Sequence, residues 1–134
     1  MALIVPAVIL TGCFGNSYAL NAPANVRVNA ENNRVMWDAV TSDNEAHTNI
    51  RYQIRWETAA AGMSHDWVNV TGLEWDPAQA GANGLGQDLP NAGGKIRLEV
   101  RAIADGEGGP IHTLNQTAYS RWVRVDWTRP TADA

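Results

Sequence analysis

The sequence predicts an all-β fold, a seven-stranded antiparallel sandwich of two sheets that follows an apolar N-terminal arm. Short segments of alternating apolar and polar residues follow one another from about residue 22, which is typical of half-buried strands. Clusters of Gly, Asn, Asp and Pro separate these segments, and no stretch repeats its apolar residues with a helical period. The 134 residues are enough for one domain of ordinary size.

The first half of the domain offers three strands. Residues 25–29 place two valines on one side of a strand, and residues 34–37 place Val35 and Trp37 there. Residues 50–57 are the clearest strand, because four large apolar side chains alternate with four polar ones. Alternate side chains of a strand point to opposite faces, so each of these segments has one side for the core and one for water.

The second half offers four strands. Residues 66–70 and 73–76 are short, whereas residues 95–104 alternate four apolar side chains with three charged ones. Residues 121–127 turn Val125 inward. The side chains expected in the core are Val35, Trp37, Tyr52, Ile54, Trp56, Leu98, Val100 and Val125.

Five segments in order resemble a fibronectin type III domain. They are residues 23–28, 35–40, 52–56, 89–103 and 119–128, and Ile96 stands where that family usually has a tyrosine. The resemblance implies an immunoglobulin-like β-sandwich over residues 22–129, with residues 1–21 as the arm and residues 130–134 as a flexible tail. It also implies a protein that spaces or binds other molecules.

Residues 1–26 carry no charge, and residues 2–10 form an unbroken apolar run. A run of nine is too short to cross a bilayer as a helix, which takes about 20 residues. Pro6 favours an extended or irregular arm. The side chains expected to contact a partner are Leu3, Ile4, Val5, Val8, Ile9 and Leu10.

The tetrapeptide Leu10-Thr11-Gly12-Cys13 resembles a bacterial lipobox, in which the cysteine is lipidated and becomes the new N-terminus. Cys13 is the single cysteine of the chain, so no internal disulfide is possible. No Lys or Arg precedes the apolar run, as a signal peptide would have. Two interpretations therefore stay open: an arm that remains on the protein, and a signal segment that is removed.

Composition and motifs argue against several classes. The net charge of −4 does not suit nucleic acid, and the three histidines have no metal-ligand spacing. The sequence contains no phosphate-binding loop and no nucleophile motif. We therefore expect no enzyme, no cofactor and no metal.

Two candidate binding surfaces remain, and the first is a pair of polar loops. Residues 38–49 and 105–117 are expected to lie at the same end of a sandwich of this kind. Recognition often uses such loops on a rigid scaffold. The candidate residues are Glu45, His47, Glu107 and His112.

The second surface is a sheet face. Trp122 should point outward because Val125 points inward, and Arg97 and Arg101 point outward on the neighbouring strand. We expect the Trp122 ring within about 6 Å of at least one of these guanidinium groups. The segment 119–122 partly resembles the tryptophan–serine box of cytokine-receptor domains, where such a ladder exists. A stabilising ladder is the first interpretation, and an exposed aromatic binding surface is the alternative.

The expected function is that of a non-catalytic structural or binding module. The first setting is a virion structural protein, on a phage tail or capsid, whose arm docks on a neighbouring subunit. The alternative is an exported lipoprotein, anchored through Cys13 in the bacterial outer membrane, that displays the domain at the cell surface. A membrane partner is expected in the second setting only.

Overall fold

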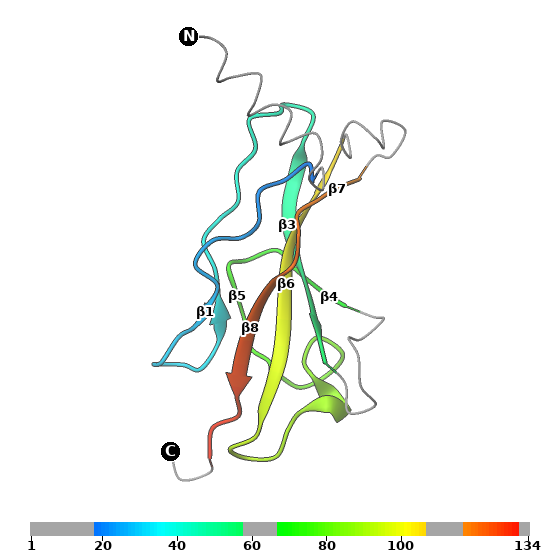
Figure 1. Ribbon diagram of the computed structural model, residues 1–134. Coiled ribbons are helices and arrows are strands. Elements are labelled where there is room, and N and C mark those ends of the chain that lie inside the picture. The colour runs from blue at the N-terminus through cyan, green and yellow to red at the C-terminus, as the bar shows by residue number, and fades with distance from the viewer. Residues whose placement is uncertain (1–17, 58–66, 107–116, 132–134) are drawn as a thin grey trace.

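The structure of the chain is a computed structural model that describes residues 18–57, 67–106 and 117–131. It has two antiparallel sheets packed face to face, with no α-helix in the described residues (Figure 1). The predicted all-β class with two sheets is thereby confirmed. The smaller sheet contains, in spatial order, β1 (Arg27–Val28), β2 (Val35–Met36) and β5 (Glu74–Trp75).

The larger sheet is built around one long strand, β6, which pairs with a partner on each side. Its strands are β4 (Val68–Val70), β3 (Thr48–Trp56) and β6 (Lys95–Asp105), followed by β7 (Thr117–Tyr119) and β8 (Val123–Thr128), which both pair with the far edge of β6. A short 3₁₀ turn, η1 (Gly86–Asp88), lies between β5 and β6. β3 and β6 are therefore the two central strands of this sheet.

The described residues form eight strands rather than the expected seven. Residues 121–127 were expected to form one strand, but pairing begins earlier, at β7, and resumes at β8 on the same edge. Tyr119 pairs with Ile103 and Val123 pairs with Val100, so four residue steps on this edge lie opposite three on β6. This mismatch is a β-bulge, which puts one extra residue in an edge strand.

Ser120 closes the bulge by hydrogen bonding. The backbone N–H of Ala102 donates to the Ser120 hydroxyl at 2.8 Å, and that hydroxyl donates to the carbonyl oxygen of Arg121 at 2.9 Å. The backbone N–H of Ser120 donates to the carbonyl oxygen of Ala102 at 2.9 Å. The serine side chain therefore replaces the carbonyl that the bulge takes out of the ladder.

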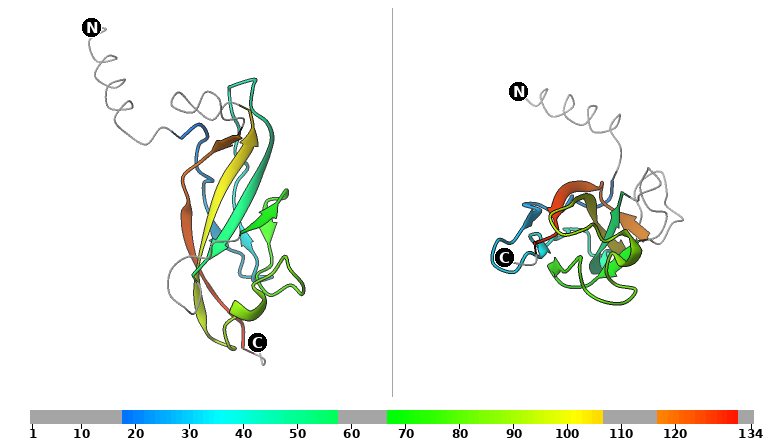
Figure 2. Two further views of the ribbon diagram at one scale, coloured as in Figure 1. Left: turned by 90° about the vertical axis from the view of Figure 1, so that its right-hand side faces the viewer. Right: turned by 90° about the horizontal axis from the view of Figure 1, so that it is seen from below.

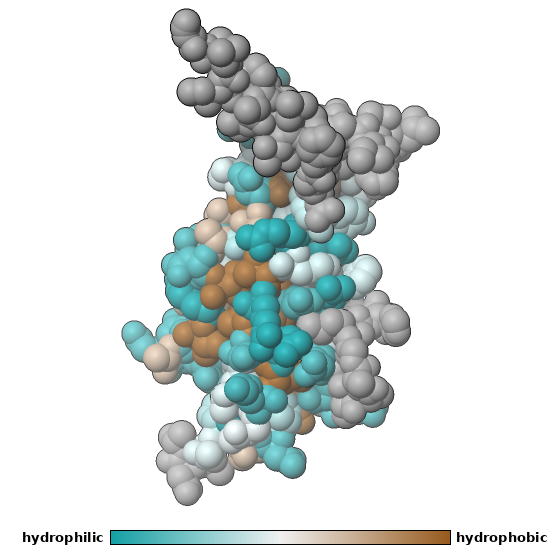
Figure 3. Space-filling view, in the orientation of Figure 1, coloured by the Kyte–Doolittle hydropathy of each residue, from teal (hydrophilic) through white to brown (hydrophobic). Residues whose placement is uncertain are grey.

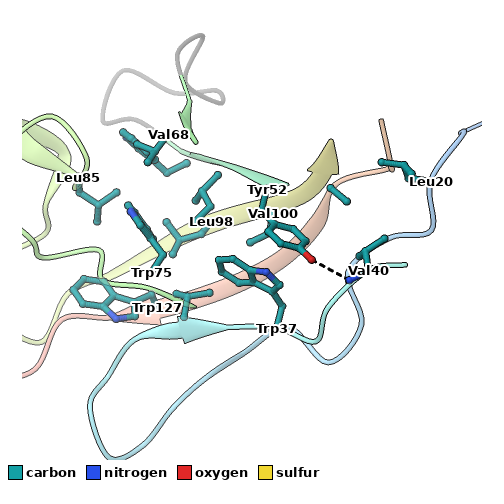
Figure 4. Close-up of a cluster of buried hydrophobic side chains, with 14 of the residues drawn as sticks. Leu20, Trp37, Val40, Tyr52, Val68, Trp75, Leu85, Leu98, Val100 and Trp127 are labelled. Atoms are coloured by element: carbon teal, nitrogen blue, oxygen red, sulfur yellow. Dashed lines mark hydrogen bonds between the residues drawn. The ribbon is translucent and has the colours of Figure 1, made fainter. Parts of the chain in front are cut away.

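The core lies between the sheets and follows the predicted alternation (Figure 4). Seven of the eight expected core residues are buried, whereas Val125 is partly buried and packs against the cluster. Trp127 and Trp75 complete the core with their indoles buried. Leu20 is 4% exposed and belongs to the same cluster, although it was assigned to the arm. Packing of the domain therefore begins before Ala22.

A hydroxyl inside the core fastens the loop that follows β2. The Val40 backbone N–H donates to the Tyr52 hydroxyl at 2.9 Å (Figure 4). The ring of Tyr52 also lies against Trp37, with centroids 5.3 Å apart.

On one side of the sandwich, between β1 and β8, the surface is apolar (Figure 3).

The chain enters the sandwich at one end and leaves it at the other. The backbone N–H of Leu20 bonds to Tyr119, beside the Asp105 end of β6. The backbone N–H of Arg129 bonds to Gly94, next to the Lys95 end (Figure 2). The eleven residues of β6 separate these ends by roughly 33 Å at a strand's rise per residue.

We expect Trp37→Ala to lower the free energy of unfolding by about 3–5 kcal/mol, because its buried ring leaves a cavity between the sheets. The indole N–H has no hydrogen-bond partner in the part of the chain that the structure describes, so the expected loss is one of packing. Urea unfolding measures it. Leu73→Ala is the control, since that side chain is exposed and should change stability by less than about 0.5 kcal/mol. Equal midpoints for the two variants would contradict the inward position of Trp37.

Candidate functional site

The outer face of the five-stranded sheet is the side turned away from the core, and pairs of arginine and carboxylate cover it. The pairs are Arg51–Asp105 at 3.1 Å, Arg55–Glu99 at 2.7 Å, Arg97–Glu57 at 3.7 Å and Arg124–Asp126 at 3.3 Å. Surface pairs of this kind each stabilise by about 0–1 kcal/mol. In each of these four pairs, the positive charge of the arginine is balanced by the carboxylate.

Arg101 lies on the same face and has no carboxylate partner among the described residues. Its guanidinium carbon is 4.2 Å from the centre of the Tyr119 ring, 4.4 Å from Trp122 and 5.2 Å from Trp67. Burial lowers the pKa of Arg101 below its usual value, because a covered cation loses hydration. The ring faces replace part of that hydration by cation–π attraction.

Trp122 also lies against a second arginine. The guanidinium carbon of Arg55 is 4.1 Å from the centre of the Trp122 ring. The rings of Trp67 and Trp122 are tilted by 51° with centroids 6.3 Å apart. We call these five residues, Arg55, Trp67, Arg101, Tyr119 and Trp122, the aromatic–arginine cluster. It spans β3, the residue just before β4, β6 and the bulged edge.

The bulge brings two of the rings to the same cation. In a regular strand, Tyr119 and Trp122 would point to opposite faces, because they are three residues apart. The extra residue between β7 and β8 reverses the alternation once, so both rings contact Arg101. Ser120, between them, points toward the interior and is 1% exposed.

A row of hydrogen bonds runs beneath the cluster, across three strands. Arg101 Nε donates to Gln53 Oε1 at 2.8 Å, and Gln53 Nε2 donates to Asn69 Oδ1 at 3.1 Å. The register places Gln53 opposite both Arg101 and Asn69. Gln53 is 5% exposed although it points outward, so its amide is satisfied within the sheet.

The structure contains one of the two stacking contacts that the sequence offered. Trp122 lies on Arg101 within the expected distance, whereas Arg97 pairs with Glu57. Arg97 lies opposite Asp126, but Trp122 precedes Val123, the partner of Val100. Val100 lies three residues from Arg97 along β6, which is about 10 Å, and Trp122 lies on the far side of Val123 from Asp126. The Trp122 ring therefore does not reach Arg97. Arg55, which alternation did not single out, takes the second place.

Trp67 is a member of the cluster that the sequence analysis missed. Val68 faces the core, so alternation along β4 turns both Trp67 and Asn69 outward. That signal was present in the sequence, but the strand is short and lies at the edge of the sheet. Trp67 is 42% exposed.

The two candidate loops meet at their bases, since Thr48 pairs with Asp105. Glu45 is exposed, and His47 Nδ1 lies 2.7 Å from the hydroxyl of Ser42. Gly106 has φ of 116°, and a side chain there would overlap the carbonyl oxygen of Ala46. The bases are therefore packed closely, which requires glycine.

Several candidate residues lie outside the residues that the structure describes. They are Glu107 and His112 of the second loop, Cys13, and the arm residues Leu3, Ile4, Val5, Val8, Ile9 and Leu10. In the three described ranges, no three His, Cys, Asp or Glu side chains are grouped so that they hold a metal ion. The same ranges contain no helix whose length and hydropathy suit a membrane crossing.

Comparison with known proteins gives no relative: no family model matches the chain, and neither the curated proteins nor the solved structures include a match.

We expect Ser120→Ala to destabilise the domain by about 1–3 kcal/mol, because the buried N–H of Ala102 loses its acceptor. Urea unfolding measures the loss, and near-ultraviolet circular dichroism reports the environment of Trp122. Ser42→Ala removes a hydroxyl that bonds to His47 in the first loop and should cost less. If Ser120→Ala matched this control, the bulge would not depend on the hydroxyl.

We expect a double-mutant cycle of Trp122→Ala and Arg101→Gln to give a coupling energy of about 0.5–1 kcal/mol, as a cation–π contact at a partly exposed site does. The matched cycle of Trp122→Ala with Arg97→Gln should give a value near zero, because Arg97 pairs with Glu57. Chemical unfolding of the singles and doubles provides both values. Equal couplings would show that the contact with Arg101 contributes nothing specific.

Proposed function

We propose that the chain is a non-catalytic module with a fibronectin type III fold, tethered by its N-terminal segment and presenting its domain to a protein partner. The sheet orders support the fold, since the third, sixth and last strands share one sheet as that family requires. The sequence segments that resemble the family lie on those strands.

The observation that carries the proposal is the position of the two ends. The chain enters beside Leu20, and the residues around it line one hollow with Thr41–Asn44 of the first loop. It leaves beside Arg129, at the other end of β6. A tether before Tyr18 therefore places the first loop near the anchoring structure and holds the Gly93–Lys95 end away from it. This is the arrangement of a spacer or display module.

A lipid tether at Cys13 is the setting that a specific motif favours. Leu10-Thr11-Gly12-Cys13 resembles a lipobox around the chain's single cysteine. Four residues lie between Cys13 and Tyr18, and the five residue steps that join the two positions span at most about 18 Å. The domain would stand close to the outer surface of a bacterial membrane.

The virion setting, which the sequence analysis places first, would instead have residues 1–17 dock on a neighbouring subunit of a phage tail or capsid. The uncharged, apolar composition of that segment favours it, because exposed apolar surface of this length favours association. In both settings the domain is presented to a protein partner, and the settings differ only in how the N-terminal segment is attached.

The mass of the mature N-terminus separates the two tethers. For the full chain expressed in bacteria, a lipid tether predicts removal of residues 1–12, addition of a lipid mass and recovery in the membrane fraction. Cys13→Ser should abolish all three, and Ser17→Ala, outside the motif, should abolish none. An intact Met1, or loss of Met1 alone, would favour the virion arm.

A truncation tests tethering itself, whatever its chemistry. It should begin at Tyr18 rather than at Asn21, because Leu20 is part of the core. We expect this variant to fold with an unchanged urea midpoint but to lose its attachment. Normal attachment of the truncated domain would contradict both settings.

A further inference from the structure

We infer that the aromatic–arginine cluster is a docking site for a carboxylate on a partner protein, an acidic side chain flanked by an apolar one. The inference rests on the proposed function, since it names the partner chemistry of a module taken to bind protein. Of the two candidate surfaces, it selects the outer sheet face rather than the loops.

The first argument is a charge that has no carboxylate partner within residues 18–57, 67–106 and 117–131. On the outward side of β3, β6 and β8, five arginines face four carboxylates, and each carboxylate is taken by an arginine other than Arg101. The chain as a whole has a net charge of −4. Arg101 is therefore a local positive site on a negative protein, and complementary charge steers an acidic partner toward such a site.

The second argument is the hydrogen-bonding capacity of that guanidinium. Arg101 Nε is occupied by Gln53, which fixes the orientation of the group. Its terminal nitrogens have no hydrogen-bond partner among the described residues. A guanidinium offers those N–H groups in a planar fork that matches a carboxylate.

The third argument is the composition of the rim. Trp67 is 42% exposed and Tyr18 is 50% exposed. Tyr119 and, less strongly, Tyr18 act to raise the pKa of Arg101, against the larger lowering effect of burial. Trp, Tyr and Arg are the residues that dominate binding energy at protein interfaces. Exposed rings around one fixed cation suit an acidic side chain with an apolar neighbour.

The test uses the full chain labelled with ¹⁵N and two capped tripeptides, acetyl-Phe-Glu-Phe-amide and acetyl-Phe-Gln-Phe-amide. The indole N–H signals of Trp67 and Trp122 report binding at the cluster. We expect saturable shifts with the Glu peptide, with a dissociation constant on the order of 1 mM. The Gln peptide should bind about tenfold more weakly, since it lacks the charge. Binding of the Glu peptide should weaken as salt is added.

Two arginine variants form a matched pair on the same face. Arg101→Gln should weaken binding of the Glu peptide about tenfold, whereas Arg124→Gln, which removes a guanidinium paired with Asp126, should leave it unchanged. Trp67→Ala provides a second variant at a more exposed position, with a several-fold loss expected. Thermal unfolding of each variant shows whether it is folded.

Equal binding of the Glu and Gln peptides, or equal losses in the two arginine variants, would overturn the inference. So would the absence of a saturable shift at about 10 mM peptide. Vesicles containing phosphatidylglycerol are a further probe: if they shift the two indole signals and the Glu peptide does not, the site is one for lipid phosphate and the inference fails. None of these outcomes bears on the N-terminal mass, so failure here is distinguishable from failure of the tethering proposal.

Discussion

The hydrogen bond between the Ser120 hydroxyl and the Ala102 N–H sets the position of the last edge of the larger sheet. It admits one extra residue between β7 and β8 without leaving a buried donor unpaired. After the bulge, Val123 and Val125 of β8 point toward the core, and before it Ala118 of β7 points toward the core. Between them, Tyr119 and Trp122 are both turned to the outer face, which an unbroken strand does not allow.

Strand β6 couples this outer face to the core. Val100 and Ala102 are fully buried on either side of Arg101, so packing between the sheets fixes the backbone that carries the guanidinium. Gln53 then fixes its orientation from the neighbouring strand. The aromatic–arginine cluster is thus held by rigid elements rather than by loops, which reduces the ordering cost that a binding surface has to meet.

Alternation in the sequence predicts the strands that line the core, and for residues 96–102 it predicts the face of each side chain correctly. It fails where the period of two is interrupted: the bulge at Ser120 hid β7, because residues 117–119 are out of phase with Val123 and Val125. Alternation also predicts which face of the sheet a side chain lies on. It does not predict which side chains of the neighbouring strands lie next to it, because that depends on the strand register. For that reason Arg55 rather than Arg97 lies on Trp122.

The placement of the two chain ends has a mechanical consequence. A pull between Leu20 and Arg129 acts along the strands, and β8 is drawn past β6 in the direction of its own axis. The ladder between them, from Lys95–Thr128 to Val100–Val123, then carries the tension in shear. Its hydrogen bonds lie across the strands and share the load, instead of opening one after another as in unzipping. A domain held at one end and grasped at the other would resist extension in this geometry.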